Sequence, residues 1–377
     1  MTGSEAPPRV ALAILRLAPA GGLEQHALRL AATLASRGAA VTLVTTRAPG
    51  TKPEGVALDL IAARGASNHG RLAAFARDAA RAVAGRFDVA VVCHAVPGFD
   101  VVFCADPSRA APGGLRGWLP RYATYARLER EAFGPERLGR ALLLSSAQLE
   151  GFVRNDHAPP ERMFLLPPTV DRLRAGPAAP GERSAARTTF GLSDDVPAWL
   201  WTGLQAHTKG LDRALAALAT AADARLLVVG LDPAGRGGRR MARLAARLGV
   251  ANRVRWLGFV SDEELRAVFA AADLLVHPSR ADVTGTVILE AMAAGLAVIT
   301  TAVCGYGEHV TAADAGVVLP EPFSAAALAA AVAATPERRA AWSANALAYT
   351  RRDTLFTGIE RAAELIMAAR RRPASGA

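Results

Sequence analysis

Short apolar runs alternate with stretches of helical periodicity along this sequence, and the alternation occurs twice. The first series starts with VALAILRLA at residues 10–18, followed by a glycine turn and a helix-like stretch that ends near Gly38. The second starts with PAWLWTGL at residues 197–204 and runs to DLLVHP at residues 273–278. Strands that alternate with helices predict a parallel sheet with helices on both faces. We therefore expect an α/β protein with two Rossmann-like, doubly wound parallel-sheet domains that face a cleft.

Length and a local change of composition locate the predicted domain boundaries. A chain of 377 residues is long enough for two domains. Residues 171–187 are rich in Ala, Pro, Gly and Arg, which is typical of a linker. We predict a first domain over residues 1–172, a linker over 173–190 and a second domain over 191–355. A C-terminal helix within residues 356–377 is expected to pack back toward the first domain, although its basic end could instead contact lipid.

The composition is that of a packed globular protein with a basic surface. Hydrophobic residues make up 51% of the chain and charged residues 21%, which argues against disorder. A net charge of +10 favours anionic partners, namely nucleic acid, phosphorylated substrates or an acidic membrane, without choosing among them. The three cysteines show no metal-ligand spacing and cannot all pair, which indicates a reducing compartment. We expect neither a secretory signal nor a spanning helix, so any membrane contact would be peripheral.

The stretch from His277 to Val310 combines two carboxylates with a predicted helix start. The apolar run before it predicts a strand, and the loop after that strand should lie at the carboxyl edge of a sheet, where open α/β folds bind ligands. Gly285 begins the next predicted helix, whose first amides would form an anion site. Asp282 precedes this site and Glu290 lies about one turn into the helix, which suits hydroxyl groups of a sugar or ribose. Alternatively, Asp282 only caps the helix and Glu290 is a solvated acid.

Two further loops carry groups that suit a diphosphate. Lys209 lies in the loop QAHTKG before a predicted helix, where its ammonium group can reach phosphate oxygens. Gly21 and Gly22 stand at the start of the first predicted helix and would allow a close approach of phosphate. A surface lysine and a tight turn are the plain alternatives. The full dinucleotide fingerprint is absent from this glycine turn.

Two polar residues, His94 and Asp100, flank a break between two apolar runs of the first half. We expect both at the mouth of the first sheet, although a lone histidine there is often structural. Residues 107–140 then interleave arginines with aromatic residues, which suits an interfacial helix on an anionic membrane or contact with nucleic acid. The alternative is a solvated arginine face with aromatic side chains packed beneath it.

Several of these motifs together resemble the retaining GT-B glycosyltransferases of the large fourth family, and within it the lipopolysaccharide core glucosyltransferase I group. The resemblance covers nearly the whole chain in order. It rests on APAGGLEQHALRLAATLASRG, SNHGRLAAFARD, PGFDVVFCADPSRA, YARLEREAF, TKGLDRALAAL and AADLLVHPSRADVTGTVILEAMAAGLAVITTAVCGY. The stretch TTAVCGYGEHV, which overlaps the end of the last motif, is its most specific part together with SNHG and PGFDV. The helix with two carboxylates separated by seven residues would alone indicate only a broad family.

The resemblance implies roles for individual residues. The first domain would bind the acceptor and the second the nucleotide sugar. Catalytic roles fall on Asp282, Lys209 and Asp100. The implied donor-binding residues are Gly21, Gly22, Thr208, Lys209, Asp282, Val283, Thr284, Gly285, Thr286 and Glu290. The implied acceptor or membrane residues are His94, Arg109, Arg116, Trp118, Arg121 and Tyr122.

Three positions depart from the family pattern, all on the donor side. Asp282 stands where the family usually has glutamate, and Thr208 stands where a basic residue is common. Thr169 replaces the glycine of a Pro-Pro-Gly turn. These departures bear on the identity of the donor sugar.

The function implied by the resemblance is retaining transfer of a hexose, glucose from UDP-glucose, onto the inner core of lipopolysaccharide. No metal and no cofactor are expected besides the nucleotide-sugar substrate, and the leaving phosphate would accept the proton of the acceptor hydroxyl. We expect a monomer on the cytoplasmic face of the inner membrane, with lipid-A-linked core oligosaccharide and the anionic membrane surface as partners and no nucleic acid. The alternatives are another nucleotide sugar with another glycolipid acceptor, a two-lobed epimerase, a phosphorylase, and a non-catalytic sugar-binding or nucleic-acid-binding relative.

Overall fold

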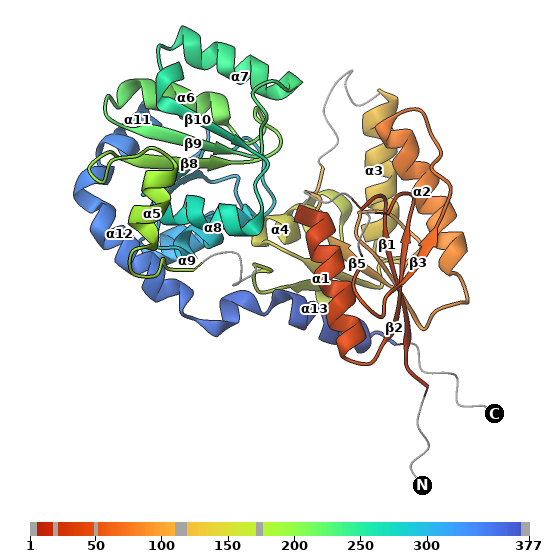
Figure 1. Cartoon of the computed structure of the whole chain (residues 1–377). Helices are drawn as coiled ribbons and strands as arrows, with labels where there is room; N and C mark the ends of the chain where they lie inside the picture. The colour runs from red at the N-terminus through yellow and green to blue at the C-terminus, as the bar shows by residue number, and fades with distance from the viewer. Residues whose placement is uncertain (1–5, 18–21, 49–51, 110–118, 171–175, 371–377) are drawn as a thin grey trace, which may run out of the picture. The chain divides into compact units, whose positions relative to one another are not determined.

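The computed structural model describes residues 6–17, 22–48, 52–109, 119–170 and 176–370 (Figure 1). The chain divides into two compact units. The first contains Met1–Thr169 together with Thr357–Ala377, and the second contains Val170–Phe356. None of the helices in the described ranges is long and apolar enough to cross a membrane.

The first unit is built on a sheet of seven parallel strands in the order β3-β2-β1-β4-β5-β6-β7. Its strands are β1 (Arg9–Ile14), β2 (Ala40–Thr45), β3 (Ala57–Leu60), β4 (Val89–Val92), β5 (Val101–Cys104), β6 (Arg140–Leu143) and β7 (Met163–Leu165). Its helices are α1 (Gly22–Ser36), α2 (Asn68–Val83), α3 (Pro120–Phe133), α4 (Ser146–Asp156) and α13 (Gly358–Met367). The order reverses between β1 and β4, as in a doubly wound fold.

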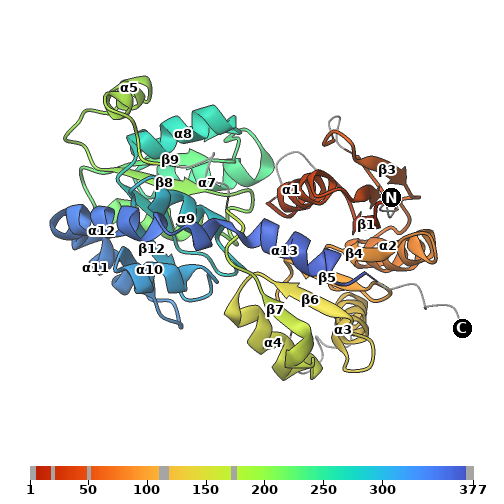
Figure 2. The ribbon, with the colours of Figure 1, turned by 90° about the horizontal axis from the view of Figure 1, so that it is seen from below.

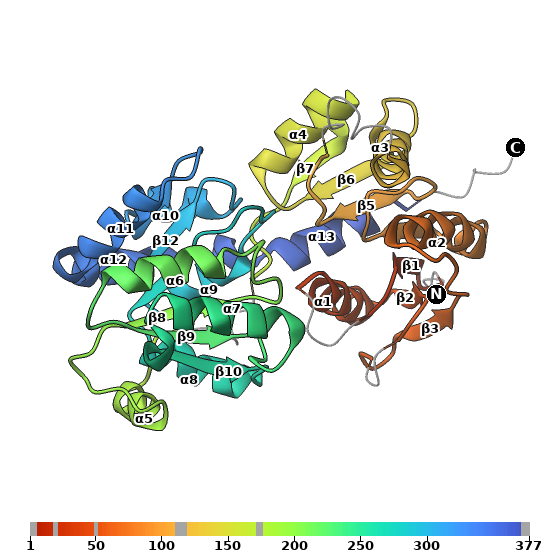
Figure 3. The same cartoon turned by 90° about the horizontal axis from the view of Figure 1, so that it is seen from above.

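Residues of β1 alternate between two hydrophobic cores. Val10, Leu12 and Ile14 pack with α1 and α13 on one face of the sheet. Ala11 and Ala13 pack with α2, α3 and α4 on the other face. Figures 2 and 3 show α1 and α2 on opposite sides of β1. Because both faces are covered, the strand is apolar from Val10 to Ile14 rather than alternating.

The C-terminal helix α13 belongs to the first unit, which is where the sequence predicted residues 356–377 to pack. Ile359 and Ile366 are buried beside α1 in the same core as β1. The start of α13 lies close to the backbone of Pro167, at the end of the first unit's main segment. Only glycine fits at position 358, because a Cβ atom there would lie 2.2 Å from the carbonyl oxygen of Pro167. Arg140 also donates a hydrogen bond to the carbonyl oxygen of Leu365 (3.0 Å).

The second unit has six parallel strands in the order β10-β9-β8-β11-β12-β13. Its strands are β8 (Ala198–Thr202), β9 (Arg225–Val229), β10 (Val254–Gly258), β11 (Leu274–His277), β12 (Ala297–Thr301) and β13 (Gly316–Leu319). Its helices are α5 (Glu182–Thr189), α6 (Leu211–Thr220), α7 (Arg236–Arg247), α8 (Asp262–Ala271), α9 (Thr286–Ala293), α10 (Gly307–Ala313), α11 (Ala325–Ala333) and α12 (Thr335–Thr350). Both predicted parallel sheets are therefore present.

The two faces of this second sheet are also covered by helices. Trp199 and Trp201 of β8 pack toward α6, α7 and α11. Leu200, between them, packs toward α8 and α9. Figure 1 shows α6 and α7 on one side of β8 to β10, with α8 and α9 on the other.

The predicted linker at residues 173–190 is wrong for its second half, because α5 forms part of the second unit. Residues 171–175 lie outside the described part of the chain. The Arg187 side chain is almost fully buried and donates to the carbonyl oxygen of Ala271 (2.9 Å), and Arg183 forms an ion pair with Asp273 (2.7 Å). The composition was misleading because the arginines of α5 serve as packed hydrogen-bond donors rather than solvated side chains.

Candidate active site

The predicted site residues of the second unit lie where its strand order reverses. Strands β8 and β11 are neighbours in the sheet. After β8 the chain adds β9 and β10 on one side of this pair, and after β11 it adds β12 and β13 on the other side. Lys209 lies in the loop after β8, and Asp282 lies in the loop after β11. A crevice outside the carboxyl ends of such strands is the usual ligand site of a doubly wound sheet.

Lys209 and Asp282 form an ion pair in this structure. The Nζ atom of Lys209 lies 2.6 Å from Oδ2 of Asp282, and the two side chains are 26% and 9% exposed. Trp201 fixes the lysine backbone by donating from Nε1 to the carbonyl oxygen of Lys209 (2.9 Å). The next residue, Gly210, has a φ of +71°, and a Cβ atom there would lie 2.0 Å from the carbonyl oxygen of Pro278. Only glycine allows the two loops to approach this closely.

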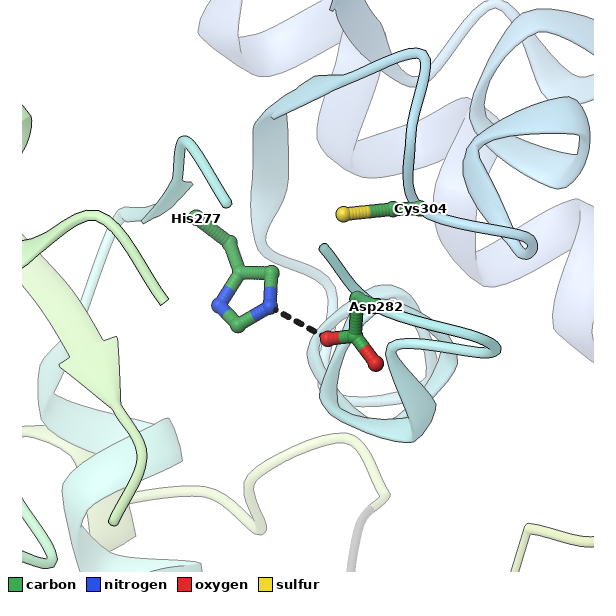
Figure 4. Close-up of side chains that lie close together, drawn as sticks. All are labelled: His277, Asp282 and Cys304. Carbon is green, nitrogen blue, oxygen red and sulfur yellow. Dashed lines mark hydrogen bonds and ion pairs between the residues drawn. The ribbon is translucent and has the colours of Figure 1, made fainter. Parts of the chain in front are cut away.

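The Asp282 carboxylate accepts from three groups of the protein. Besides the contact with Lys209, Oδ2 lies 2.9 Å from Nε2 of His277 (Figure 4). Oδ1 accepts from the backbone N–H of Gly285 (3.0 Å). Because Nε2 of His277 faces a carboxylate, we assign the proton to that nitrogen. Nε2 also lies 3.0 Å from Oγ of Ser279. These contacts fix both the aspartate and the loop that carries it.

The pKa of Asp282 lies well below its usual range. Burial alone would raise this pKa, but the hydrogen bond and charge of His277 and then the charge of Lys209 outweigh burial. The carboxylate is therefore ionised at neutral pH, as the ion pair requires.

The loop between Asp282 and α9 holds the start of that helix rigidly. The N–H groups of Gly305 and Tyr306 donate to the carbonyl oxygens of Asp282 (3.3 Å) and Thr284 (2.7 Å). Gly285 precedes α9 with a φ of +73°, a conformation that glycine adopts without strain. The N–H of Ile288 donates to the carbonyl oxygen of Gly285 (2.8 Å). The amides of Thr286 and Val287, at the very start of the helix, precede the i to i−4 ladder and form a potential anion site. Val283, Thr284 and Thr286 are partly exposed around this helix start.

Glu290 lies in the second turn of α9 and is 7% exposed. It is the only charged residue in this otherwise apolar helix. The alternative of a solvated first-turn acid is therefore excluded. Its predicted contact with a ribose remains a prediction.

Sequence analysis missed an arginine clamp that joins the two loops. Arg280 makes a bidentate ion pair with Asp212 (2.8 and 2.7 Å) and donates to the carbonyl oxygen of His207 (2.6 Å). The Arg280 backbone N–H donates to the carbonyl oxygen of Thr208 (2.8 Å), which ties down another predicted donor residue. Arg213 donates to two carbonyl oxygens of the loop after β11 (3.1 Å each). The signal in the sequence was the arginine of the run HPSR, which begins at the last residue of β11 and continues into the loop.

Three side chains here have the chemistry of metal ligands. The ligand atoms of His277, Asp282 and Cys304 lie within 4.8 Å of one another (Figure 4). A divalent cation would have to compete with the ammonium group of Lys209, which already contacts Asp282. Burial, and then the charge of Asp282, raises the pKa of the Cys304 thiol, which further disfavours the thiolate. In this structure Asp282 is paired with Lys209, and the absence of a metal from the reaction stays a prediction.

In the first unit, His94 joins the carboxyl ends of three strands. Its Nε2 accepts from the N–H of Leu15, which follows β1 (3.1 Å). Its Nδ1 lies 3.7 Å from Oδ2 of Asp106, which follows β5, and its ring packs edge-on against Phe75. Burial alone would raise the pKa of Asp106, but His94 and Arg109 outweigh burial and lower it. Asp106 is an acid at this edge that sequence analysis missed, although it directly follows an apolar run.

The expectation that Asp100 lies at the mouth of the sheet with His94 is wrong. Asp100 directly precedes β5, and in a parallel sheet the residue before a strand lies at the amino edge. Its Oδ2 accepts from the N–H of Ala90 (2.9 Å), and its carbonyl oxygen accepts from the N–H of Arg140 (3.0 Å). Asp100 therefore joins the amino ends of β4 and β6, and we assign it no catalytic role.

The remaining predicted residues of the first unit are only partly described. Gly21, Arg116 and Trp118 lie outside the described residues. Gly22 begins α1, and no atom lies within 4 Å of the place where its Cβ would be. Arg121 is exposed in the first turn of α3, with Tyr122 beside it.

Arg109 contacts other residues of the first unit instead of extending freely into solvent. Its guanidinium group contacts Asp106 (3.4 Å) and lies 4.4 Å from the ring centroid of Tyr125. Its backbone N–H donates to Glu129 (2.8 Å). The predicted membrane or acceptor contact of Arg109 stays a prediction.

Comparisons with known proteins identify the family of this chain. Residues 20–172 match the family described as Glycosyltransferase Family 4, and residues 187–348 match the family described as Glycosyl transferases group 1. The lipopolysaccharide glucosyltransferase WaaG of Escherichia coli (strain K12) is 33% identical over 374 residues, which cover 95% of this chain and 98% of that protein. The D-inositol 3-phosphate glycosyltransferase of Geodermatophilus obscurus is 36% identical over 241 residues, which cover 59% of this chain and 52% of that protein.

Solved structures lead to the same family. The crystal structure of WaaG matches with a TM-score of 0.87 and 32% identity, covering 95% of this chain and 99% of that one. Anabaena Alr3699/HepE in complex with UDP-glucose matches with a TM-score of 0.74 over 96% of this chain and 100% of that one, but at 18% identity it supports the fold alone. The chain therefore has the GT-B fold and belongs to the glycosyltransferase family that includes WaaG, so it is a glycosyltransferase.

Proposed function

We propose that this enzyme transfers glucose from UDP-glucose, with retention of configuration, to a sugar hydroxyl on the inner core of lipopolysaccharide. The observation that carries the proposal is the contact between Lys209 and Asp282 at the start of α9 (2.6 Å). This contact brings together a cation and a helix N-terminus, which can bind a diphosphate, and a carboxylate, which can bind the hydroxyl groups of a sugar. The match to WaaG over 95% of this chain supports the choice of donor and acceptor.

Stabilisation of the leaving diphosphate is the main catalytic task in this scheme. When the donor binds, the ammonium group of Lys209 leaves Asp282 and contacts the phosphate oxygens. The amides at the start of α9 also face the diphosphate. The negative charge that develops on the diphosphate in the transition state is therefore stabilised by groups that are already in place. The bond between the sugar C1 and the β-phosphate oxygen breaks, and the bond from C1 to the acceptor oxygen forms on the same face. The acceptor proton passes to the departing phosphate oxygen.

The two carboxylates orient hydroxyl groups rather than transfer protons. Glu290 binds the ribose, and Asp282, once released by Lys209, faces the donor sugar. Because the two carboxylates hold the reacting groups close together in the correct orientation, the reaction rate increases. We propose that no metal and no further cofactor take part.

Contact with the acceptor requires the enzyme to work at a lipid surface. We propose that the monomer associates peripherally with the cytoplasmic face of the inner membrane through the basic and aromatic segment at residues 108–133. Within the described part of that segment, the exposed Arg121 and the half-buried Tyr122 begin α3. Its arginines favour anionic lipid headgroups.

A panel of nucleotide sugars tests this proposal. The purified enzyme is incubated with each nucleotide sugar and with lipopolysaccharide truncated in its inner core, and mass spectrometry detects the added sugar. We expect one hexose to be added from UDP-glucose, with an α linkage by NMR. Conversion of the nucleotide sugar to an epimer without acceptor would instead show an epimerase. Phosphate-dependent release of sugar phosphate would show a phosphorylase. Binding without any turnover would show a non-catalytic relative.

A further inference from the structure

Helix α7 of the second unit carries a row of arginines along one face. Its sequence is RGGRRMARLAAR, which contains five arginines and no acidic residue. Residues 236, 240, 243 and 247 are separated by four, three and four positions, so their side chains lie above one another on the helix surface. Arg239 lies next to them. We call this set of five the arginine face of α7.

The opposite side of the helix is anchored in the unit. Met241 and Ala245 are buried in the core beneath α7, and Gly238 is buried beside the preceding loop. All five arginines are exposed. Because the buried residues face the core, the arginine face lies on the opposite, solvent-exposed side of the helix. Figure 1 shows α7 at the outer side of this unit.

The charge on this face is not balanced within the unit. No ion pair among the described residues involves an arginine of α7. Arg236 lies in the first helical turn, where the helix dipole disfavours a cation. The pairs four residues apart, such as Arg236 with Arg240 and Arg243 with Arg247, repel each other. A face selected for helix stability would alternate these arginines with acids.

The arginines also enclose a shallow hollow. Its volume is about 760 Å³, and its lining consists of the five arginines and Ala246. Guanidinium groups bind phosphate oxygens in bidentate fashion and remain charged at any physiological pH. The hollow thus presents several phosphate-binding forks side by side.

We propose that the arginine face of α7 binds the phosphate groups of an anionic lipid surface. A row of like charges on the outer side of a helix suits a plane of headgroups. Nucleic acid is the poorer fit, because α7 contains no aromatic residue on which bases could stack and no Asn or Gln to contact base edges. This surface goes beyond the proposed transfer reaction and uses none of the residues at 108–133.

Vesicle binding by paired variants tests the proposal. The full-length protein is sedimented with vesicles of phosphatidylcholine alone or with 30 mol% phosphatidylglycerol, a composition of roughly physiological charge. We expect R240Q/R243Q to weaken binding to the anionic vesicles about 30-fold, because each basic residue near the surface contributes about fivefold. The matched control is R351Q/R352Q, which removes two exposed arginines from the same unit and the same amount of net charge. It should weaken binding by less than about threefold, and R240K/R243K should retain most of the affinity.

Three outcomes would overturn the proposal. Equal losses in both double glutamine variants would show an effect of net charge alone. Unchanged vesicle binding by R240Q/R243Q would show that the face does not contact lipid. A loss confined to single-stranded RNA or inorganic polyphosphate, measured in parallel, would assign the face to a soluble polyanion. The assay contains neither nucleotide sugar nor acceptor, so its result does not depend on the proposed transfer.

Discussion

Asp282 has one methylene group fewer than the glutamate usual in the family. The shorter side chain keeps the carboxylate against the loop, where it contacts the backbone N–H of Gly285 as well as His277 and Lys209. Lys209 therefore has two alternative partners, the aspartate and an incoming diphosphate. In the proposed mechanism, Lys209 exchanges the aspartate for the diphosphate when the donor binds.

Lys209→Ala should lower the transfer rate about 100- to 1000-fold, because one preorganised group facing the leaving charge is lost. The fold should survive, since the lysine side chain is partly exposed. The measurement is the steady-state transfer rate from UDP-glucose, with circular dichroism as the check on folding. Lys52→Ala is the matched control, because Lys52 is the only other lysine in the chain. A transfer rate near that of the unaltered enzyme in Lys209→Ala would refute the phosphate role.

Asp282→Asn should separate binding from turnover. The neutral amide no longer competes for Lys209 or repels the diphosphate, so UDP should bind about fivefold more tightly, as expected for a change of ~1 kcal/mol. Transfer should fall at least about tenfold, because the sugar and the lysine are no longer positioned. Calorimetric titration with UDP and the transfer assay together measure the two effects. Weaker UDP binding in this variant would show that Asp282 supports the diphosphate rather than competes with it.

Helix α3 contains a buried acid that is tied to the loop after β5. Glu129 is 1% exposed, and its Oε1 accepts from Ser108 (3.1 Å) and from the N–H of Arg109 (2.8 Å). Burial, and the neighbouring carboxyl group of Asp156, raise the pKa of Glu129 to about 7. Burial also raises the pKa of Asp156. The two carboxyl groups therefore hold a proton in the folded state that they release on unfolding.

This pair makes stability depend on pH near neutrality. A carboxyl group whose pKa is raised on folding contributes stability that is fully present below its unfolded pKa, near 4.5, and is lost as the pH rises through about 7. The free energy of unfolding should therefore fall between pH 5 and pH 8, as measured by denaturant titration, and Glu129→Gln should flatten that fall. Glu131→Gln, on the same helix with its side chain 33% exposed, should keep it. An equally steep fall in Glu129→Gln would assign the pH dependence to other groups.

At the scale of the whole molecule, the chain returns to its first unit after completing the second. Helix α13 fills the core between α1 and the sheet, so the first unit requires residues from both ends of the chain. Ile366→Ala should therefore lower the free energy of unfolding of the first unit by about 2–5 kcal/mol, the usual cost of truncating a buried isoleucine. Denaturant titration with a probe in each unit measures this change, and UDP binding reports on the second unit.

A matched control for this prediction is Leu60→Ala, in the edge strand β3, where the side chain is 61% exposed. Its effect should stay within about 0.5 kcal/mol, as for most surface substitutions. An equal effect of the two variants would mean that α13 does not contribute to the core of the first unit.

The sequence by itself determined the order of strands and helices and the positions of Lys209 and Asp282 in loops that follow strands. This was possible because hydrophobic periodicity and glycine or proline punctuation are local properties. The same local pattern predicted a C-terminal helix, which the structure shows as α13. It could not distinguish a linker rich in arginine from α5, whose arginines find buried partners only after folding.

Tertiary structure alone decided which loops meet and at which edge of a sheet each acid lies. Lys209 contacts Asp282 because β8 and β11 pair across 75 residues of sequence, Trp199 with Leu274. Asp100 and Asp106 are six positions apart, yet they lie at opposite edges because β5 runs between them. The pairing and extent of parallel strands depend on contacts between distant residues, which no local pattern of sequence encodes.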